Sequence, residues 1–219
     1  MITLYGFGRI FPEGHGETKD MWVQWALEEV GLPYRVHALD HTGGELDSPA
    51  YARISPFHQA PVIDDDGFVV AESGAIVLYL AEKAGKLIPR DFHGRMHVTQ
   101  WCFAAAATLL PTFQAMDLAA MFDPDRAARR LHEALPGLSQ RCLAHVDERL
   151  ARQPWIAGDD FTVADIMLAG VLRLVRKTDL LAPYPAVSAF YERCMARPAW
   201  QRTLQMYAQR LGTSVDKVR

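Results

Sequence analysis

Cysteine is scarce in this chain of 219 residues, which contains only Cys102, Cys142 and Cys194. Their odd number and wide spacing argue against a disulfide framework, so we expect a reduced cytoplasmic protein. The longest apolar stretch, CFAAAATLL, has about the length of a buried helix segment and is far short of a membrane span. The first residues, MITLYG, lack the basic and long apolar segments of a secretory signal.

An excess of basic charge is also missing. The formal net charge is -3 at pH 7, which argues against a partner made of nucleic acid. A small cluster of arginines (Arg126, Arg129 and Arg130) lies among acidic residues and predicts a solvated helix face. His93 and His97 have the spacing of a metal pair on a helix, but no third ligand is evident, so we expect no metal.

The first 85 residues alternate between strand and helix patterns. ITLY and PYRVHAL predict strands, and between them TKDMWVQWALEEVG predicts a helix that ends at Gly31. A helical turn is expected over residues 50–53. VIDDDGFVV predicts two strands joined by a hairpin turn at Asp66 and Gly67, and SGAIVLYLAEKAG predicts a closing helix. The order β-α-β-α-β-β-α predicts a small α/β domain with a mixed sheet over residues 1–85.

Strand patterns then disappear. Residues 86–91 are expected to form a linker, and residues 92–219 an all-helical second domain. One helix start is well marked by FTVADI, in which Thr162 and Asp165 have the spacing of a capping box.

Two features suggest where chemistry takes place. Pro61 opens a strand, and if the Ala60–Pro61 bond is cis, the backbone groups of Ala60 would face outward and pair with an extended peptide; an ordinary trans proline is the alternative. Glu72 and Ser73 open a helix, with Ser73 as its N-cap. The first-turn amides of that helix could bind a carboxylate of a ligand, and Glu72 could bind its ammonium group, so the two residues together would recognise the α-amino acid end of a ligand. The alternative is that Glu72 and Ser73 form a simple capping pair.

Together these motifs resemble the cytosolic glutathione transferases over nearly the whole chain. SPFHQAPVIDDDGFVVAESGAIVLYLAEK is similar to the family segment that carries Gln, Val-Pro and Glu-Ser. WIAGDDFTVADIMLAG and YPAVSAFYERCMARPAW resemble helices of the family's second domain. The resemblance implies a thioredoxin-like first domain that binds glutathione as co-substrate, followed by the all-helical domain, in a homodimer.

The resemblance also implies roles for individual residues. Pro61 would be a cis-proline, Ala60 would pair with the cysteinyl part of glutathione, Gln59 would contact the glycyl side, and Glu72 and Ser73 would hold the γ-glutamyl end. The helical domain would line a pocket for a hydrophobic electrophile. Candidates for one wall of that pocket, which at helical spacing could equally be core residues, are Phe103, Leu110 and Met116.

The chain departs from the family pattern at two places. His58 stands where a glycine is common before Gln59, and Leu46 and Asp47 stand where some members carry basic residues that neutralise the glycyl carboxylate. The remaining candidates for that neutralising role are His41, His58 and Arg9, although the two histidines could simply be exposed loop residues.

The residue that activates the thiol is not evident. Family members place a Tyr, Ser or Cys near the start of the first helix, whereas this chain has a longer loop without any of the three. Because the first domain contains no cysteine, disulfide exchange by a thiol of the protein is disfavoured. Three candidates remain for stabilising the thiolate: the hydroxyl of Thr18, which could instead be an N-cap, then Arg9, then His15.

The sequence therefore predicts a glutathione transferase that conjugates the thiolate to hydrophobic electrophiles, with peroxide reduction as a side activity. The alternative is a non-catalytic binding or scaffold protein of the same fold, which the missing hydroxyl favours.

Overall fold

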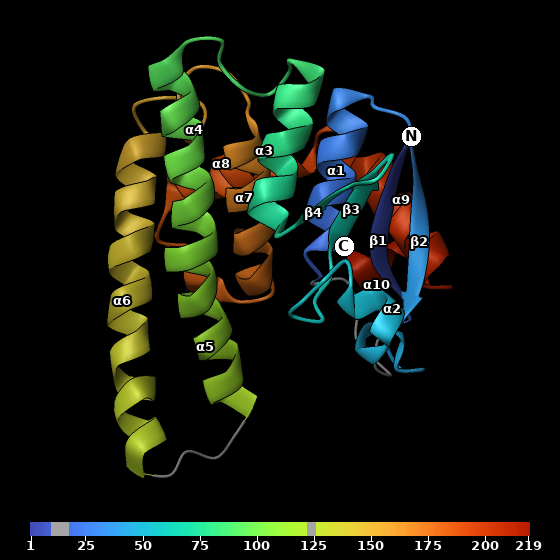
Figure 1. Ribbon diagram of the computed structural model, residues 1–219. Coiled ribbons are helices and arrows are strands. Elements are labelled where there is room, and N and C mark those ends of the chain that lie inside the picture. Colours follow the sequence, from blue (N-terminus) through green and yellow to red (C-terminus); the bar gives the residue numbers. More distant parts are fainter. Residues whose placement is uncertain (10–17, 122–125) are drawn as a thin grey trace. The chain divides into compact units, whose positions relative to one another are not determined.

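The chain forms two compact units in the computed structural model, which describes residues 1–9, 18–121 and 126–219. One unit comprises Met1–Ile88 together with Met195–Arg219, and the other comprises Pro89–Cys194 (Figure 1). The chain passes from one unit to the other after Ile88 and returns after Cys194. The last helices, however, belong to the first unit and not to the helical domain predicted over residues 92–219.

The first unit is built on a four-stranded mixed sheet with the order β2-β1-β3-β4. Strand β1 runs parallel to β2 and antiparallel to β3, and β3 pairs antiparallel with β4. The hairpin between β3 and β4 turns at Asp66 and Gly67, both of which have positive φ (51° and 97°), as the sequence predicted. The strands are β1 (Ile2–Arg9), β2 (Tyr34–Asp40), β3 (Val62–Asp65) and β4 (Phe68–Ala71).

Helices cover both faces of this sheet. The longer ones, α1 (Asp20–Val30) and α3 (Ser73–Ala84), pack against each other and end at glycines in the left-handed conformation, Gly31 and Gly85. On the other face, Tyr5 and Phe7 of β1 pack on a cluster that includes residues of the 3₁₀ helix η1 (Glu45–Asp47) and the short helix α2 (Pro49–Ala52). Successive side chains of a strand alternate between faces, so Ile2 and Leu4 point away from this cluster.

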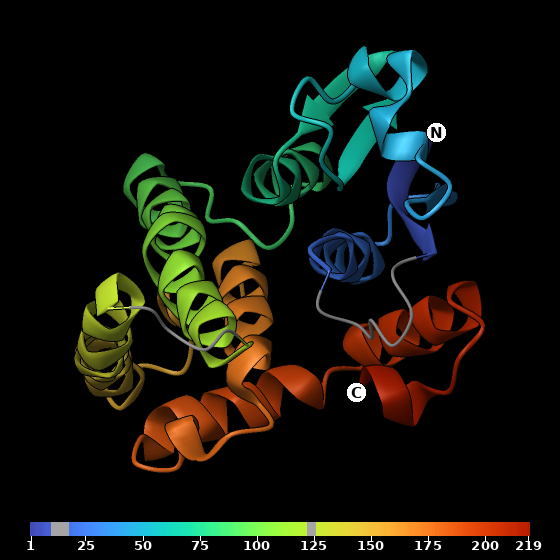
Figure 2. The ribbon, with the colours of Figure 1, turned by 90° about the horizontal axis from the view of Figure 1, so that it is seen from below.

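The last helices complete the first unit by packing along α1. Helix α9 (Pro198–Arg210) places Trp200 against Trp25, with ring centroids 5.0 Å apart, and is followed by the short α10 (Val215–Val218). Three ion pairs of the described residues tie this segment to α1: Arg197 to Glu29 at 2.6 Å, Arg202 to Glu28 at 2.8 Å, and Arg210 to Asp20. These contacts explain why the C-terminal segment joins the first unit. Figure 2 shows α9 and α10 in red, with the N-terminal strand in dark blue.

The second unit is helical, as predicted. Figure 1 shows α4, α5 and α6 as its long helices, and α7 packs against α4 with every one of its residues buried. A π-helical stretch, η2, joins α4 to α5, and two 3₁₀ helices, η3 and η4, lie between α7 and α8. The bounds are α4 (Phe92–Ala104), η2 (Ala105–Leu109), α5 (Leu110–Met121), α6 (Arg126–Leu150), α7 (Val163–Leu172), η3 (Arg173–Val175), η4 (Asp179–Leu181) and α8 (Pro185–Met195).

The predicted capping box opens α7. The Asp165 carboxylate accepts hydrogen bonds from the backbone N–H of Thr162 (2.8 Å) and of Ile156 (2.7 Å). Burial raises the pKa of Asp165 to about 6. None of the three cysteines forms a disulfide, and Cys102 and Cys194 are buried among the helices, as expected of core thiols. None of the described helices is both long and apolar enough to cross a membrane.

Candidate functional site

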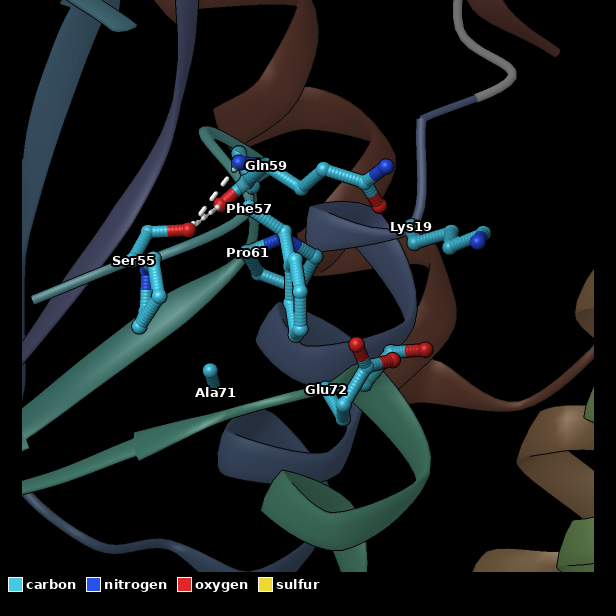
Figure 3. Close-up of a pocket in the computed structure, with 10 residues that line it drawn as sticks. Lys19, Ser55, Phe57, Gln59, Pro61, Ala71 and Glu72 are labelled. Atoms are coloured by element: carbon cyan, nitrogen blue, oxygen red, sulfur yellow. Dashed lines mark hydrogen bonds between the residues drawn. The ribbon is translucent and has the colours of Figure 1, made fainter. Parts of the chain in front are cut away.

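A pocket in the first unit collects the residues expected to bind glutathione. Gln59, Ala60, Pro61, Glu72 and Ser73 all line it, although they come from two segments of the chain (Figure 3). Three more lining residues come from the same two segments: Pro56 and Phe57, which lie shortly before Gln59, and Ala71, the last residue of β4. The two remaining lining residues, which the sequence analysis did not name, are Lys19 and Ser55.

The hydroxyl groups of Tyr51 and Ser55 bind the backbone of the segment before β3. The Gln59 carbonyl accepts hydrogen bonds from Ser55 Oγ (2.8 Å) and from Tyr51 Oη (2.9 Å), and the Gln59 N–H donates to Ser55 Oγ (3.0 Å). Burial raises the pKa of Tyr51, so its hydroxyl keeps its proton and remains a donor. The Ala60–Pro61 bond that follows is cis, as the motif indicated. These bonds fix the backbone of Gln59 at the pocket, with its own side chain exposed.

The start of α3 differs from the prediction in one respect. Glu72, and not Ser73, is the N-cap residue, and Ser73 is the first residue of the helix. Glu72 has φ 69° and ψ 118°, and its side chain makes no capping hydrogen bond. A simple capping pair is therefore wrong. The carboxylate of Glu72 is exposed at the pocket, next to the first-turn amides of α3.

Lys19 brings a positive charge to the same pocket. It is the N-cap residue of α1 and is half-buried. In Figure 3 the side chain of Gln59 extends toward Lys19, and Glu72 lies below them at the start of α3. Lys19 lies one position after Thr18 and was not among the candidates predicted from the sequence. The signal that could have indicated Lys19 is a charged residue directly before the predicted helix.

Thr18, the first candidate for stabilising the thiolate, does not line the pocket. Its hydroxyl lies 2.6 Å from the hydroxyl of Tyr207 on α9, and its carbonyl accepts the N–H of Met21. Of the other two candidates, His15 lies outside the described residues, and so does the side chain of Arg9. The N-cap alternative for Thr18 is wrong, because α1 begins one residue later than that alternative requires.

A buried arginine of α9 fixes the start of α1. Arg210 donates to the Phe7 carbonyl at the end of β1 (2.9 Å), to Gln24 Oε1 (3.0 Å) and to the carboxylate of Asp20. Asp20 is fully buried, and its Oδ1 has no hydrogen-bond partner among the described residues. Burial raises the pKa of Asp20, and the Arg210 guanidinium opposes that shift. There is no room for a side chain at Gly6, because a Cβ there would lie 2.6 Å from Asp20 Oδ2.

The two candidate histidines do not line the pocket. His58 has positive φ (54°), and its Nδ1 lies 2.8 Å from the carbonyl of Leu46. His41 packs edge-on against Phe7, with ring centroids 5.8 Å apart. Both are exposed, as the alternative of loop residues implies, and their suggested role at the glycyl carboxylate stays a prediction.

The candidates for the electrophile pocket lie in the second unit. Leu110 is only 5% exposed, so it is a core residue and presents no surface to a ligand; its suggested role is withdrawn. Phe103 is 64% exposed on α4, and its role stays a prediction. Met116 falls within α5, but its side chain lies outside the described part of the chain.

Known proteins resemble both parts of the chain. Residues 14–82 match the family model described as glutathione S-transferase, N-terminal domain, and residues 109–198 match the one described as glutathione S-transferase, C-terminal domain. A glutathione transferase structure from Burkholderia graminis, with two glutathione molecules bound per protein subunit, is 28% identical with a TM-score of 0.81, covering 92% of this chain and 86% of that one.

Two curated relatives are also similar. Disulfide-bond oxidoreductase YfcG of Escherichia coli is 34% identical over 93% of this chain and 94% of its own length. Glutathione S-transferase D7 of Anopheles gambiae is 31% identical over 75% of this chain and 76% of its own. With a mixed four-stranded sheet, a cis proline before β3, a Glu-Ser pair at the start of α3 and these relatives, the chain belongs to the glutathione S-transferase family.

Proposed function

We propose that this protein is an enzyme that binds glutathione in the pocket of its first unit and adds the thiolate to hydrophobic electrophiles. The observation that carries the proposal is that Gln59, Ala60, Pro61, Glu72 and Ser73 line a single pocket. Family membership supports the same function, as do the glutathione molecules bound to the relative from Burkholderia graminis.

The charges of the pocket match the γ-glutamyl end of glutathione. Glu72 offers a carboxylate to the α-ammonium group, and the first-turn amides of α3, with the Ser73 hydroxyl, offer donors to the α-carboxylate. Ala60 would pair through its backbone with the cysteinyl part, and the exposed amide of Gln59 would contact the glycyl part. Held in this way, the sulfur meets a second substrate at high effective concentration, which lowers the entropic part of the barrier.

The reaction begins with loss of the thiol proton, because the thiolate is the nucleophile. The thiolate then forms a bond from sulfur to the electrophilic carbon, and a leaving group departs or a proton is taken up. With a peroxide, attack of the thiolate on oxygen releases an alcohol, and a second glutathione converts the sulfenic acid to glutathione disulfide and water. This peroxidase activity is the side activity expected from the sequence.

The name of the Escherichia coli relative favours a second candidate function, which is disulfide-bond oxidoreduction. A thiolate of bound glutathione attacks a disulfide and releases one thiol; a second glutathione attacks the mixed disulfide, giving glutathione disulfide and the second thiol. No protein thiol is required. This fits the present chain, whose cysteines all lie in the second unit, where burial raises the pKa of Cys102 to about 12.

Glutathione binding tests the proposal. We expect saturable binding by calorimetry, and Glu72→Gln should weaken it by about 10- to 100-fold, since a hydrogen bond to a charged group contributes about 1.5–3 kcal/mol. Glu82→Gln, on the same helix but outside the pocket lining, is the matched control and should bind normally. Equal affinities of the two variants would overturn the assignment of Glu72.

Turnover assays then separate the functions. Conjugation of an aromatic halide supports the transferase, and reduction of a small disulfide supports the oxidoreductase. Binding without either activity would support the alternative of a non-catalytic scaffold. We also propose, from the family resemblance, a cytoplasmic homodimer; sedimentation at the mass of one chain would contradict the dimer.

A further inference from the structure

The pocket carries a positive charge that the binding scheme above does not use. Among the described residues that line it, the charged side chains are those of Glu72 and Lys19. Glutathione ionised at sulfur has one ammonium group, two carboxylates and a thiolate. Glu72 is complementary to the ammonium group and the amides of α3 to one carboxylate, so the charged groups of glutathione that remain for Lys19 are anionic.

The charge of Lys19 is not compensated by the described protein. No carboxylate of the described residues forms an ion pair with it, although it lies half-buried at the pocket. The adjacent carboxylate, Asp20, is fully buried and is bound by Arg210. A cation is also unfavourable at the N-terminus of a helix, where the amides of the first turn already carry partial positive charge. Among the described residues, no acidic group therefore offsets this cation, and an anion in the pocket would be complementary to it.

Two anionic groups of the ligand remain for Lys19, the glycyl carboxylate and the thiolate. The side chain of Gln59 is exposed and offers amide donors to the carboxylate in the wetter part of the pocket. Pro61, beside which the cysteinyl sulfur would lie, is buried. A single cation acts more strongly in such a less hydrated place, because charges are screened less there. Thr18 does not compete for this role, since its hydroxyl is paired with Tyr207.

On this evidence, the geometry points to Lys19 as a catalytic residue whose ammonium group stabilises the thiolate of bound glutathione. The inference rests on the proposed function, because it needs glutathione in this pocket. An opposite charge within about 4–6 Å lowers the pKa of an acid by about 1–3 units. We therefore expect removal of the Lys19 charge to raise the pKa of the bound thiol by at least about one unit, which corresponds to a loss of about tenfold in kcat/KM below neutral pH.

The test compares Lys19→Met with Lys19→Arg and with Lys217→Met, an exposed lysine of α10 outside the pocket lining. Two quantities are measured on each protein: the thiol pKa of bound glutathione, from the ultraviolet absorbance of the thiolate against pH, and the affinity for S-methylglutathione, which has no ionisable thiol. Lys19→Met should raise the thiol pKa and keep the affinity for S-methylglutathione within about twofold. Lys19→Arg and Lys217→Met should leave both quantities close to those of the natural protein.

Three results would overturn the inference, and they differ. An unchanged thiol pKa in Lys19→Met removes the role altogether. An unchanged pKa with a tenfold weaker binding of S-methylglutathione assigns Lys19 to the carboxylate instead. If the natural protein binds neither glutathione nor S-methylglutathione, the proposed function itself fails, and the role of Lys19 fails with it.

Discussion

Replacing Arg210 with methionine should destabilise the first unit far more than its position near the end of the chain would suggest. The Arg210 side chain is 8% exposed, and the side chain of Asp20, which it binds, is 0% exposed. Methionine removes the cation and leaves a buried carboxylate with one oxygen that already lacks a described hydrogen-bond partner. Breaking a buried ion pair on one side costs about 3–5 kcal/mol of unfolding free energy.

The same helix provides a matched control. Arg202 also pairs with a glutamate of α1, but its side chain is 51% exposed, and exposed ion pairs contribute only about 0–1 kcal/mol. Urea unfolding followed by tryptophan fluorescence measures both variants, because Trp25 and Trp200 lie at the contact between α1 and α9. We expect Arg210→Met to lose several times more stability than Arg202→Met.

The loss should also depend on pH. Burial raises the folded-state pKa of Asp20 above its ordinary value of 3.8, and removing Arg210 raises it further. A group whose folded pKa is raised gives its stabilising contribution at low pH and loses it as the pH rises through the window between the two pKa values. The cost of Arg210→Met should therefore be smaller at about pH 5 than at pH 7. A cost that is equal at both pH values, or no larger than that of Arg202→Met, would refute the reasoning.

Two further predictions concern buried hydrogen bonds. The folded pKa of Asp165 is raised from 3.8 to about 6, so its contribution is full below pH 3.8 and is lost up to about pH 6. As the pH rises from 3.8 to about 6, the stability difference between the natural protein and Asp165→Asn should therefore shrink by about 3 kcal/mol. Urea unfolding at several pH values measures this difference, and a difference that stays constant would contradict the prediction. Ser55→Ala should weaken glutathione binding and stability more than Tyr51→Phe, because Ser55 bonds both the N–H and the carbonyl of Gln59 while Tyr51 bonds only the carbonyl. Losses of about 1–3 and about 0.5–1.5 kcal/mol in thermal or chemical unfolding are expected, and the reverse order would contradict this account of the Gln59 backbone.

The sequence predicted the parts of the fold that depend on local patterns. Glycine caps at Gly31 and Gly85, the Asp66–Gly67 turn and the capping box of Thr162 and Asp165 are all confirmed, since each requires only neighbouring residues. Five of the seven residues expected to bind glutathione line one pocket, because they were inferred from a motif that is continuous in the chain, whereas His41 and His58 are not among the residues that line it.

What the sequence could not predict depends on contacts between distant segments. The attachment of α9 to α1 requires that arginines on one helix meet acids on another, and no periodicity reveals such a pairing. The true N-cap of α3 was missed because Glu72 adopts a positive φ, which is rare for a glutamate. Lys19 was not predicted, because the family resemblance pointed to a hydroxyl or thiol near the start of α1, whereas a lysine lines the pocket there.

The division of the chain has a consequence for its synthesis. The unit that contains the pocket is made of the first segment and the last, Met1–Ile88 and Met195–Arg219, while the helical unit is one continuous segment between them. Domains fold as units while the chain grows on the ribosome. The helical unit is therefore complete before the pocket-bearing unit, even though the latter is started first. Until α9 has been synthesised, Trp25 of α1 lacks its contact with Trp200, and the carboxylate of Asp20 lacks its ion pair with Arg210.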